Sequence, residues 1–156
     1  MGQQEEANIA VVKTFYEYLA RGDRDGAYAA CMADDCVLHE ADSLPYGGVY
    51  EGREHMKQVL SGVTGRFDEF RYEIRNYLAG GDEVVVHLHM AGVGRVSRKP
   101  FALPVMELWR FRDGRAIEMQ PFLYDGTALI AALERRPAAD MQAAARAGTL
   151  APGDQT

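Results

Sequence analysis

The stretch Ala33–Glu40 constrains the fold of this chain more than any other segment. An acidic pair, Asp34-Asp35, is expected to turn the chain after a short helix, and an apolar-alternating strand begins at Cys36. Side chains alternate between the two faces of a strand, so Cys36, Leu38 and Glu40 share one face. If the first two face a core, then Glu40 points into the same apolar interior. A carboxylate there must be paired, hydrogen-bonded or raised in pKa, so the fold has to enclose Glu40.

Composition narrows the class of protein. The 156 residues are enough for one domain with one substantial core. The net charge of −6 argues against nucleic acid or an anionic membrane surface as the main partner. The first seven residues are polar and acidic, unlike a signal peptide, and no apolar run approaches the ~20 residues of a membrane span. Cys31 and Cys36 lack a metal-type pattern and are expected to be reduced and buried, in a cytoplasmic protein.

Three helices are expected before the main run of strands. Apolar residues at helical spacing predict the first, with Gly22 in the position of a C-terminal cap: Ile9, Val12, Phe15, Tyr16 and Leu19. Asp23 can cap a second, shorter helix through Cys31. A loop over Ala41–Gly48 and a short extended piece lead to a third helix, from Arg53 to Leu60.

The remainder of the chain changes to strand periodicity. Alternation predicts strands over Phe70–Arg75, Glu83–Ala91, Phe101–Arg112 and Ala116–Tyr124. The turn signals between them favour hairpins, and a final helix is expected to end at Pro137. Helices segregated from a mostly antiparallel sheet make an α+β domain, here expected over residues 8–136. Residues 1–7 are expected to be a flexible N-terminus and residues 137–156 a disordered tail.

Several segments together carry a family resemblance: Val11–Phe15, Gly22-Asp23, Ala33–Asp35, Gly48–Arg53, Glu107–Arg115 and Tyr124-Asp125. With them the chain resembles the nuclear transport factor 2-like superfamily, and within it the SnoaL-like and ketosteroid isomerase-like branch. The resemblance implies a curved, mostly antiparallel sheet that forms a cone covered by three N-terminal helices, a cystatin-like α+β barrel. It also implies a homodimer formed through the outer face of the sheet.

The resemblance assigns catalytic positions as well. Ketosteroid isomerases use a carboxylate base on the first strand, and an oxyanion hole of one Tyr and one protonated carboxylic acid. The base position falls on Glu40, the acid on Glu107 and the Tyr on Phe15, whereas Tyr16 is expected to face elsewhere. A steroid isomerase with this arrangement is therefore not expected. Limonene-type epoxide hydrolysis is also disfavoured, because Phe122 falls where one of the required acids should be.

The acidic and histidine positions have structural alternatives. Glu40 could lie in solvent or pair with Arg53, and Glu107 could be a buried structural acid satisfied by its neighbours. His87 and His89 share a face and could chelate a metal, but no pattern supplies a third ligand, so interface histidines are the simpler interpretation. We expect no metal and no cofactor.

Aromatic residues are the candidates for ligand contacts. Tyr hydroxyls can orient a flat apolar ligand, and two of them flank the glycine-containing loop after Glu40. Asp125 is expected to cap the last helix, with a pocket role as the alternative. The predicted substrate-binding set is Phe15, Tyr46, Tyr50, Trp109, Phe122 and Asp125.

The resemblance then implies a function. We expect a SnoaL-like, cofactor-independent enzyme that moves a proton next to the carbonyl of an apolar small molecule, by isomerisation, cyclisation or dehydration. Glu40 would move the proton and Glu107 would stabilise the oxyanion. The alternatives are a small-molecule-binding protein without chemistry and a dimeric interaction module whose pocket is filled by side chains.

Overall fold

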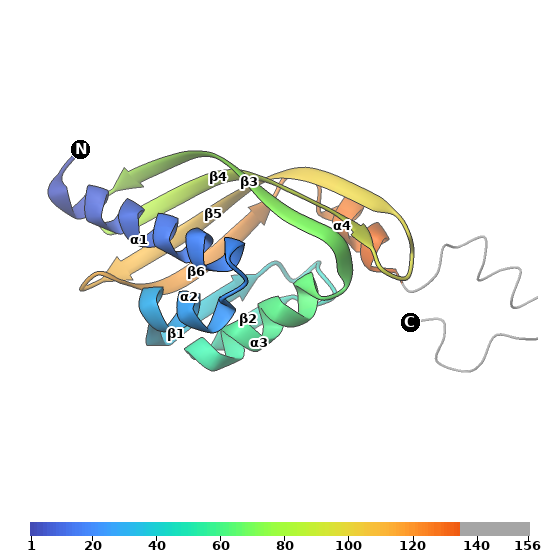
Figure 1. The fold of residues 1–156 in the computed structure, drawn as a ribbon, viewed down its shortest axis with the longest axis horizontal. Coiled ribbons are helices and arrows are strands. Elements are labelled where there is room, and N and C mark those ends of the chain that lie inside the picture. Colours follow the sequence, from blue (N-terminus) through green and yellow to red (C-terminus); the bar gives the residue numbers. More distant parts are fainter. Residues whose placement is uncertain (135–156) are drawn as a thin grey trace, which may run out of the picture.

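In the computed structural model, which describes residues 1–134, helices precede and interrupt a single sheet (Figure 1). The elements are α1 (Gln3–Ala20), α2 (Arg24–Cys31), β1 (Met32–Glu40), β2 (Gly48–Glu51), α3 (Arg53–Thr64), β3 (Phe67–Gly80), β4 (Glu83–Gly94), β5 (Pro100–Arg112), β6 (Arg115–Leu123) and α4 (Gly126–Leu133). The expected α+β class is confirmed. No helix in this part of the chain combines the length and the apolar character that crossing a membrane requires.

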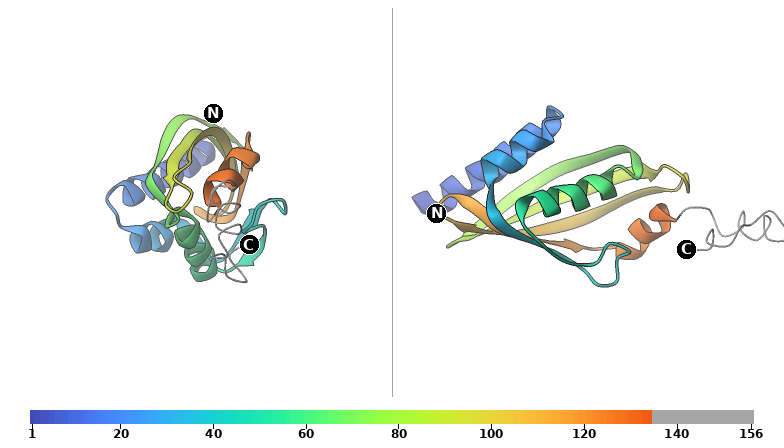
Figure 2. Two further views of the ribbon diagram at one scale, coloured as in Figure 1. Left: turned by 90° about the vertical axis from the view of Figure 1, so that its right-hand side faces the viewer. Right: turned by 90° about the horizontal axis from the view of Figure 1, so that it is seen from below.

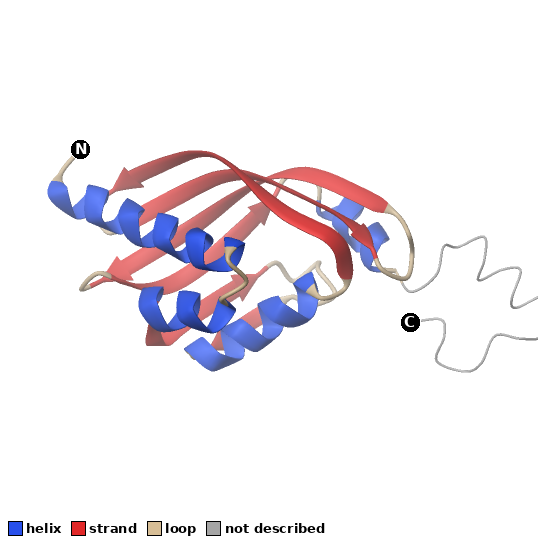
Figure 3. Ribbon diagram, viewed as in Figure 1, coloured by secondary structure: helices blue, strands red, loops and turns tan. Residues whose placement is uncertain are grey.

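The six strands form one mixed sheet in the order β2-β1-β6-β5-β4-β3. Every neighbouring pair is antiparallel except β1 and β6, which run parallel in the middle of the sheet. The helices α1, α2 and α3 gather on one side of the sheet (Figure 3), and seen end-on the sheet curls around the space that they cover (Figure 2). The predicted curved sheet with three covering helices is therefore confirmed.

Bulges contribute to this curvature, because an extra residue in one strand bends it and increases its twist. The β3–β4 register shifts between Asp68 and Arg71 and again between Ile74 and Asn76. The β1–β6 register shifts between Met32 and Val37. The strand therefore begins at Met32 and not at Cys36, and the pair Asp34-Asp35 lies in this irregular part of β1 instead of turning the chain.

The helix boundaries follow local chemistry. Gly22 has a φ of 76° just after α1, a conformation that side chains with a Cβ rarely adopt. Asp23 caps α2 by accepting a hydrogen bond from the Gly26 N–H, as expected. The helix α1 begins at Gln3, so residues 3–7, expected to be flexible, are helical. The predicted tail, 137–156, and the predicted helix end at Pro137 lie outside the described residues.

The core joins the concave face of the sheet to the helices. Trp109 of β5 is fully buried, and the Phe15 ring packs edge-on against it and against Tyr28, with centroid distances of 5.1 and 5.2 Å. Val12 and Leu38 are also fully buried. This aromatic cluster fixes α1 and α2 over the middle of the sheet, where the candidate site lies.

The close approach of α4 to the end of β4 predicts a specific stability effect. A Cβ on Gly94 would overlap the Ala132 carbonyl oxygen and the Ser97 Oγ, which are themselves hydrogen-bonded at 2.8 Å. We expect Gly94→Ala to lower the free energy of unfolding by ~1–3 kcal/mol, as overpacking does. Gly80→Ala is the matched control, because nothing lies within 4 Å of its added Cβ. Chemical denaturation of both variants measures the difference; a Gly94→Ala protein as stable as Gly80→Ala would contradict this account.

Candidate functional site

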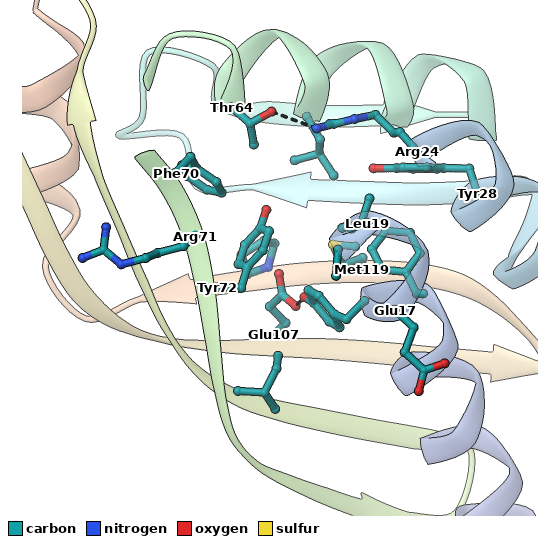
Figure 4. A pocket seen from close by; sticks show the side chains of 16 residues that line it. Glu17, Leu19, Arg24, Tyr28, Thr64, Phe70, Arg71, Tyr72, Glu107 and Met119 are labelled. Atoms are coloured by element: carbon teal, nitrogen blue, oxygen red, sulfur yellow. Dashed lines mark hydrogen bonds between the residues drawn. The ribbon is translucent and has the colours of Figure 1, made fainter. Parts of the chain in front are cut away.

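A cavity of about 640 Å³ lies between the covering helices and the concave face of the sheet (Figure 4). Its walls are largely apolar and come from α1, α2, α3, β3, β5 and β6. Within this wall, Glu107 of β5 supplies a carboxyl group, and Tyr16, Tyr28 and Tyr72 supply phenol groups. A largely apolar cavity with a few polar groups is the usual form of a small-molecule site.

Glu107 is held inside the protein by the alternation of β5, where it lies between the buried Val105 and Trp109 on the inward face. Only 7% of it is exposed. Its Oε1 accepts hydrogen bonds from the Tyr16 hydroxyl and, at 3.4 Å, from Trp109 Nε1. Burial raises the pKa of Glu107, and the two hydrogen bonds offset that effect only in part. A neutral, protonated carboxylic acid is therefore favoured at this position.

Tyr16 reaches Glu107 because of its place on α1. It follows Val12 by four residues, and residues at this spacing lie on the same face of a helix. The expectation that Tyr16 faces elsewhere is wrong: its ring lines the cavity and its hydroxyl donates to Glu107. Phe15 also lines the cavity but belongs mainly to the core beside Trp109. The chain thus has a Tyr–carboxylic acid pair, shifted by one residue from the expected position.

Glu40 ends β1 on the inward face, as the alternation predicts, and is 7% exposed. Burial raises its pKa to about 8, and a negative charge on Glu107 acts in the same direction whenever Glu107 is ionised. The alternative partner, Arg53, instead pairs with Asp34 at 2.9 Å and donates to the Met32 carbonyl. Within residues 1–134, no group donates a hydrogen bond to the Glu40 carboxyl group. Its environment therefore penalises the ionised form without compensation.

Pro121 of β6 connects the two acids. It lies opposite Glu107 in the antiparallel β5–β6 pair. On the other side of β6, the parallel β1–β6 register pairs Leu38 with Met119. Two residues further along both strands, Glu40 is therefore level with Pro121. A second cavity of about 420 Å³ contains Glu40 and is bounded by the following loop and α4; Pro121 lines both cavities. The two carboxyl groups therefore flank one proline on the inward face of three adjacent strands.

The remaining predicted ligand contacts are distributed differently. Burial raises the pKa of the Tyr46 phenol, and Glu40 lies close enough for its charge, when ionised, to raise that pKa further. Tyr50 has a structural role, because its hydroxyl donates to the Tyr46 carbonyl at 2.7 Å and its ring packs edge-on against His55. Trp109 lies behind Glu107 in the core.

Two further predicted residues lie near the second cavity. Phe122 lines it, although 52% of the residue is exposed on the outer side of the sheet. Asp125 caps α4 by accepting a hydrogen bond from the Ala128 N–H, the role expected of it. The pocket role of Asp125 stays a prediction.

Sequence reasoning missed the polar groups that helices and β3 contribute to the first cavity. Neither Tyr28 nor Tyr72 is among the predicted site residues, and neither is Arg24 of α2. The strand alternation that places Tyr72 inward was visible, but the bulges that bend β3 over the cavity were not. For Arg24 the sequence offered no signal.

His87 and His89 lie on the outer side of β4 with ring centroids 6.1 Å apart. Among the residues that the structure describes, no third His, Cys, Asp or Glu joins them in a cluster that could hold a metal ion. The inward neighbours Val86 and Leu88 are fully buried, so the histidines face away from the cavities.

A model of the SnoaL-like domain matches residues 12–119 of the chain. This chain belongs to the SnoaL-like family. The matched segment includes both buried acids and Tyr16, and it ends before Pro121. A comparison with curated proteins gives no match. The family assignment thus rests on the domain model, together with the fold.

Solved structures confirm the fold of this SnoaL-like protein. A putative SnoaL-like polyketide cyclase from Jannaschia sp. CCS1 is 21% identical with a TM-score of 0.76, covering 88% of this chain and 98% of that one. An NTF2-like protein from Burkholderia xenovorans LB400 is 22% identical with a TM-score of 0.72, covering 84% and 98%. TerC, co-crystallised with polyporic acid, is 23% identical with a TM-score of 0.65, covering 75% and 91%.

The burial of Glu40 predicts how stability depends on pH. Its folded-state pKa, about 8, lies above its ordinary value of 4.5, so the folded protein retains a proton that the unfolded chain releases between these values. The stabilisation is full below pH 4.5 and is lost as the pH rises through 8. We expect Glu40→Gln, which resembles the protonated form, to match the wild type at pH 5 and to exceed it by ~1–3 kcal/mol at pH 9.

Urea unfolding at the two pH values measures this difference. Glu51→Gln, an exposed position on the neighbouring strand β2, is the matched control and should show no such dependence. Equal gains for Glu40→Gln at pH 5 and pH 9 would mean that the carboxyl group is not protonated in the folded protein.

Proposed function

We propose that this SnoaL-like protein is a cofactor-independent enzyme that transfers a proton next to the carbonyl group of an apolar small molecule. Isomerisation, cyclisation and dehydration all begin with this step. The observation that carries the proposal is the hydrogen-bonded pair of Tyr16 and Glu107 in the wall of an apolar cavity, with a second buried acid, Glu40, nearby.

The roles follow from protonation. Glu40, when ionised, removes a proton from the carbon beside the carbonyl, and the electron pair of the broken C–H bond moves to the carbonyl oxygen. The protonated Glu107 donates a hydrogen bond to that oxygen as its negative charge develops, and the Tyr16 hydroxyl, which donates to Glu107 Oε1, holds the acid in position. Returning the proton to another carbon completes an isomerisation, whereas attack of the enolate carbon on a second carbonyl closes a ring.

Two named relatives support a small molecule as the ligand. One is described as a putative polyketide cyclase, and another, TerC, was co-crystallised with polyporic acid. A cavity of about 640 Å³ argues against an interaction module whose pocket is filled by side chains. A binding protein without chemistry is the second candidate, because Glu40 lines a different cavity from Glu107, and a catalytic base must reach the same substrate.

Proton exchange tests the chemistry without knowledge of the natural substrate. We expect the wild type to accelerate the exchange of the protons beside the carbonyl of 2-tetralone with D2O, followed by NMR. Glu40→Gln should slow this catalysed exchange by ~10²–10⁴-fold, and Tyr16→Phe should slow it by ~10–10²-fold, because Glu107 retains part of the oxyanion stabilisation. The rate should rise with pH through about 8 as Glu40 loses its proton.

Glu51→Gln again serves as the control and should exchange like the wild type. Undiminished exchange by Glu40→Gln would remove Glu40 from the mechanism. No acceleration by the wild type with any of a series of flat ketones would favour the binding protein.

We also propose a homodimer formed through the outer face of the sheet. Supporting it, the outer side of β3, β5 and β6 carries exposed apolar residues, with Leu78 52%, Met106 40% and Phe122 52% exposed. Met106 is the register partner of Phe122 on one side and of His87 on the other, so these side chains adjoin. Adjoining exposed apolar side chains such as Met106 and Phe122 are typical of subunit interfaces.

Charge placed at the centre of this surface should separate the subunits. We expect Met106→Glu to convert a dimer into a folded monomer, because a buried unpaired carboxylate is costly. Val49→Glu, 61% exposed on β2, is the control and should remain dimeric. Sedimentation velocity measures the mass, and a monomeric wild type would refute the proposed dimer.

A further inference from the structure

Arg24 brings an unneutralised positive charge to the cavity that contains Glu107. Its Nη2 donates to Thr64 Oγ1 at 3.2 Å, which places the guanidinium between α2 and α3, and the Thr64 hydroxyl is itself oriented toward the Ser61 carbonyl. Figure 4 shows this hydrogen bond at the side of the cavity formed by these helices. In the described part of the chain no carboxylate forms an ion pair with Arg24.

The acidic residues nearest to Arg24 in sequence interact with other groups. The Asp23 carboxylate caps α2, and Asp25 pairs with Lys57 at 2.8 Å. Glu17 also lines the cavity, but it points away from Arg24 in Figure 4. It lies near Tyr77, where burial raises the pKa of the phenol and the charge of Glu17 adds a smaller effect in the same direction. A guanidinium has five donors, and the structure uses one of them on Thr64.

Neutral donors surround this charge. Tyr28 and Tyr72 line the same cavity, and the charge of Arg24 acts on both phenols, lowering their pKa values against the larger raising effect of burial. In Figure 4 the Tyr28 hydroxyl points into the cavity beside Arg24. Leu19, Leu60 and Phe70 supply apolar wall, so the cavity offers a cationic group, apolar walls and the Tyr16–Glu107 pair.

We propose that Arg24 binds a carboxylate of the substrate, whose carbonyl group lies at Tyr16 and Glu107. The substrate class is then a flat keto acid with an apolar body, and not a wholly apolar ketone. One guanidinium matches one carboxylate in a two-hydrogen-bond geometry, whereas a phosphate dianion would bring a second charge near the buried acids. This inference rests on the proposed function only in taking a carbonyl compound as the ligand of the cavity.

A matched pair of probes isolates the charge. We expect the wild type to bind 6-acetyl-2-naphthoic acid at least ~10-fold more tightly than its methyl ester, measured by titration calorimetry at pH 7; tenfold corresponds to ~1.4 kcal/mol. Arg24→Gln should bind the acid and the ester within ~2-fold of each other, with the affinity for the ester unchanged. Arg24→Lys should retain part of the preference, because it keeps the charge but loses the planar fork.

Arg71→Gln is the matched control. Arg71 is an exposed arginine at the same cavity, but it points outward in Figure 4 and donates to the Glu69 carbonyl, so its removal should leave the acid preference intact. Thermal unfolding checks that each variant is folded. Equal binding of acid and ester by the wild type, no binding of the acid, or an acid preference that survives Arg24→Gln would each overturn the inference.

The result also separates the two proposals. An Arg24-dependent preference for the acid, in a protein that catalyses no proton exchange, would retain the carboxylate site and refute the enzyme. Catalysed proton exchange of 2-tetralone, without any preference for the acid over the ester, would support the enzyme and refute the carboxylate site.

Discussion

The hydrogen bond from Tyr16 to Glu107 is the interaction on which the site depends, because it joins the first helix to the middle of the sheet inside an apolar cavity. Glu107 could not remain there as a bare carboxylate without a large desolvation cost. The phenol and the indole N–H of Trp109 supply hydrogen bonds, and burial shifts the balance toward the neutral acid. The aromatic contacts of Phe15 with Trp109 and Tyr28 keep α1 where this bond can form.

Strand pairing places the second acid on the other side of the same proline. The parallel pairing of β1 with β6 brings Glu40 to one side of Pro121, and the antiparallel pairing of β5 with β6 brings Glu107 to the other. Two carboxyl groups that share a poorly solvated region disfavour double ionisation, so at least one retains its proton near neutral pH. One acid that donates and one that accepts a proton is the combination required for enolate chemistry.

The sequence predicted the fold and the two acids well but not their surroundings. Alternation placed Glu40 and Glu107 inward, and turn and cap residues such as Asp23 were identified from local chemistry. Local patterns do not encode bulges, so the start of β1 at Met32 was missed. The orientation of Tyr16 was misjudged although its spacing from Val12 indicated it. Arg24 could not be found, because its place in the cavity wall depends on how α2 and α3 pack, where Arg24 donates to Thr64.

The proposed chemistry requires one neutral and one titrating acid in the site, and NMR can measure the protonation state of both. With glutamate labelled at the carboxyl carbon, NMR spectra from pH 4 to 10 report each carboxyl group, and Glu40→Gln and Glu107→Gln assign the two signals. We expect Glu107 to show the chemical shift of a neutral acid at pH 7 and Glu40 to titrate near 8. Two carboxylates that are both ionised at pH 6 would contradict the proposed arrangement of the site.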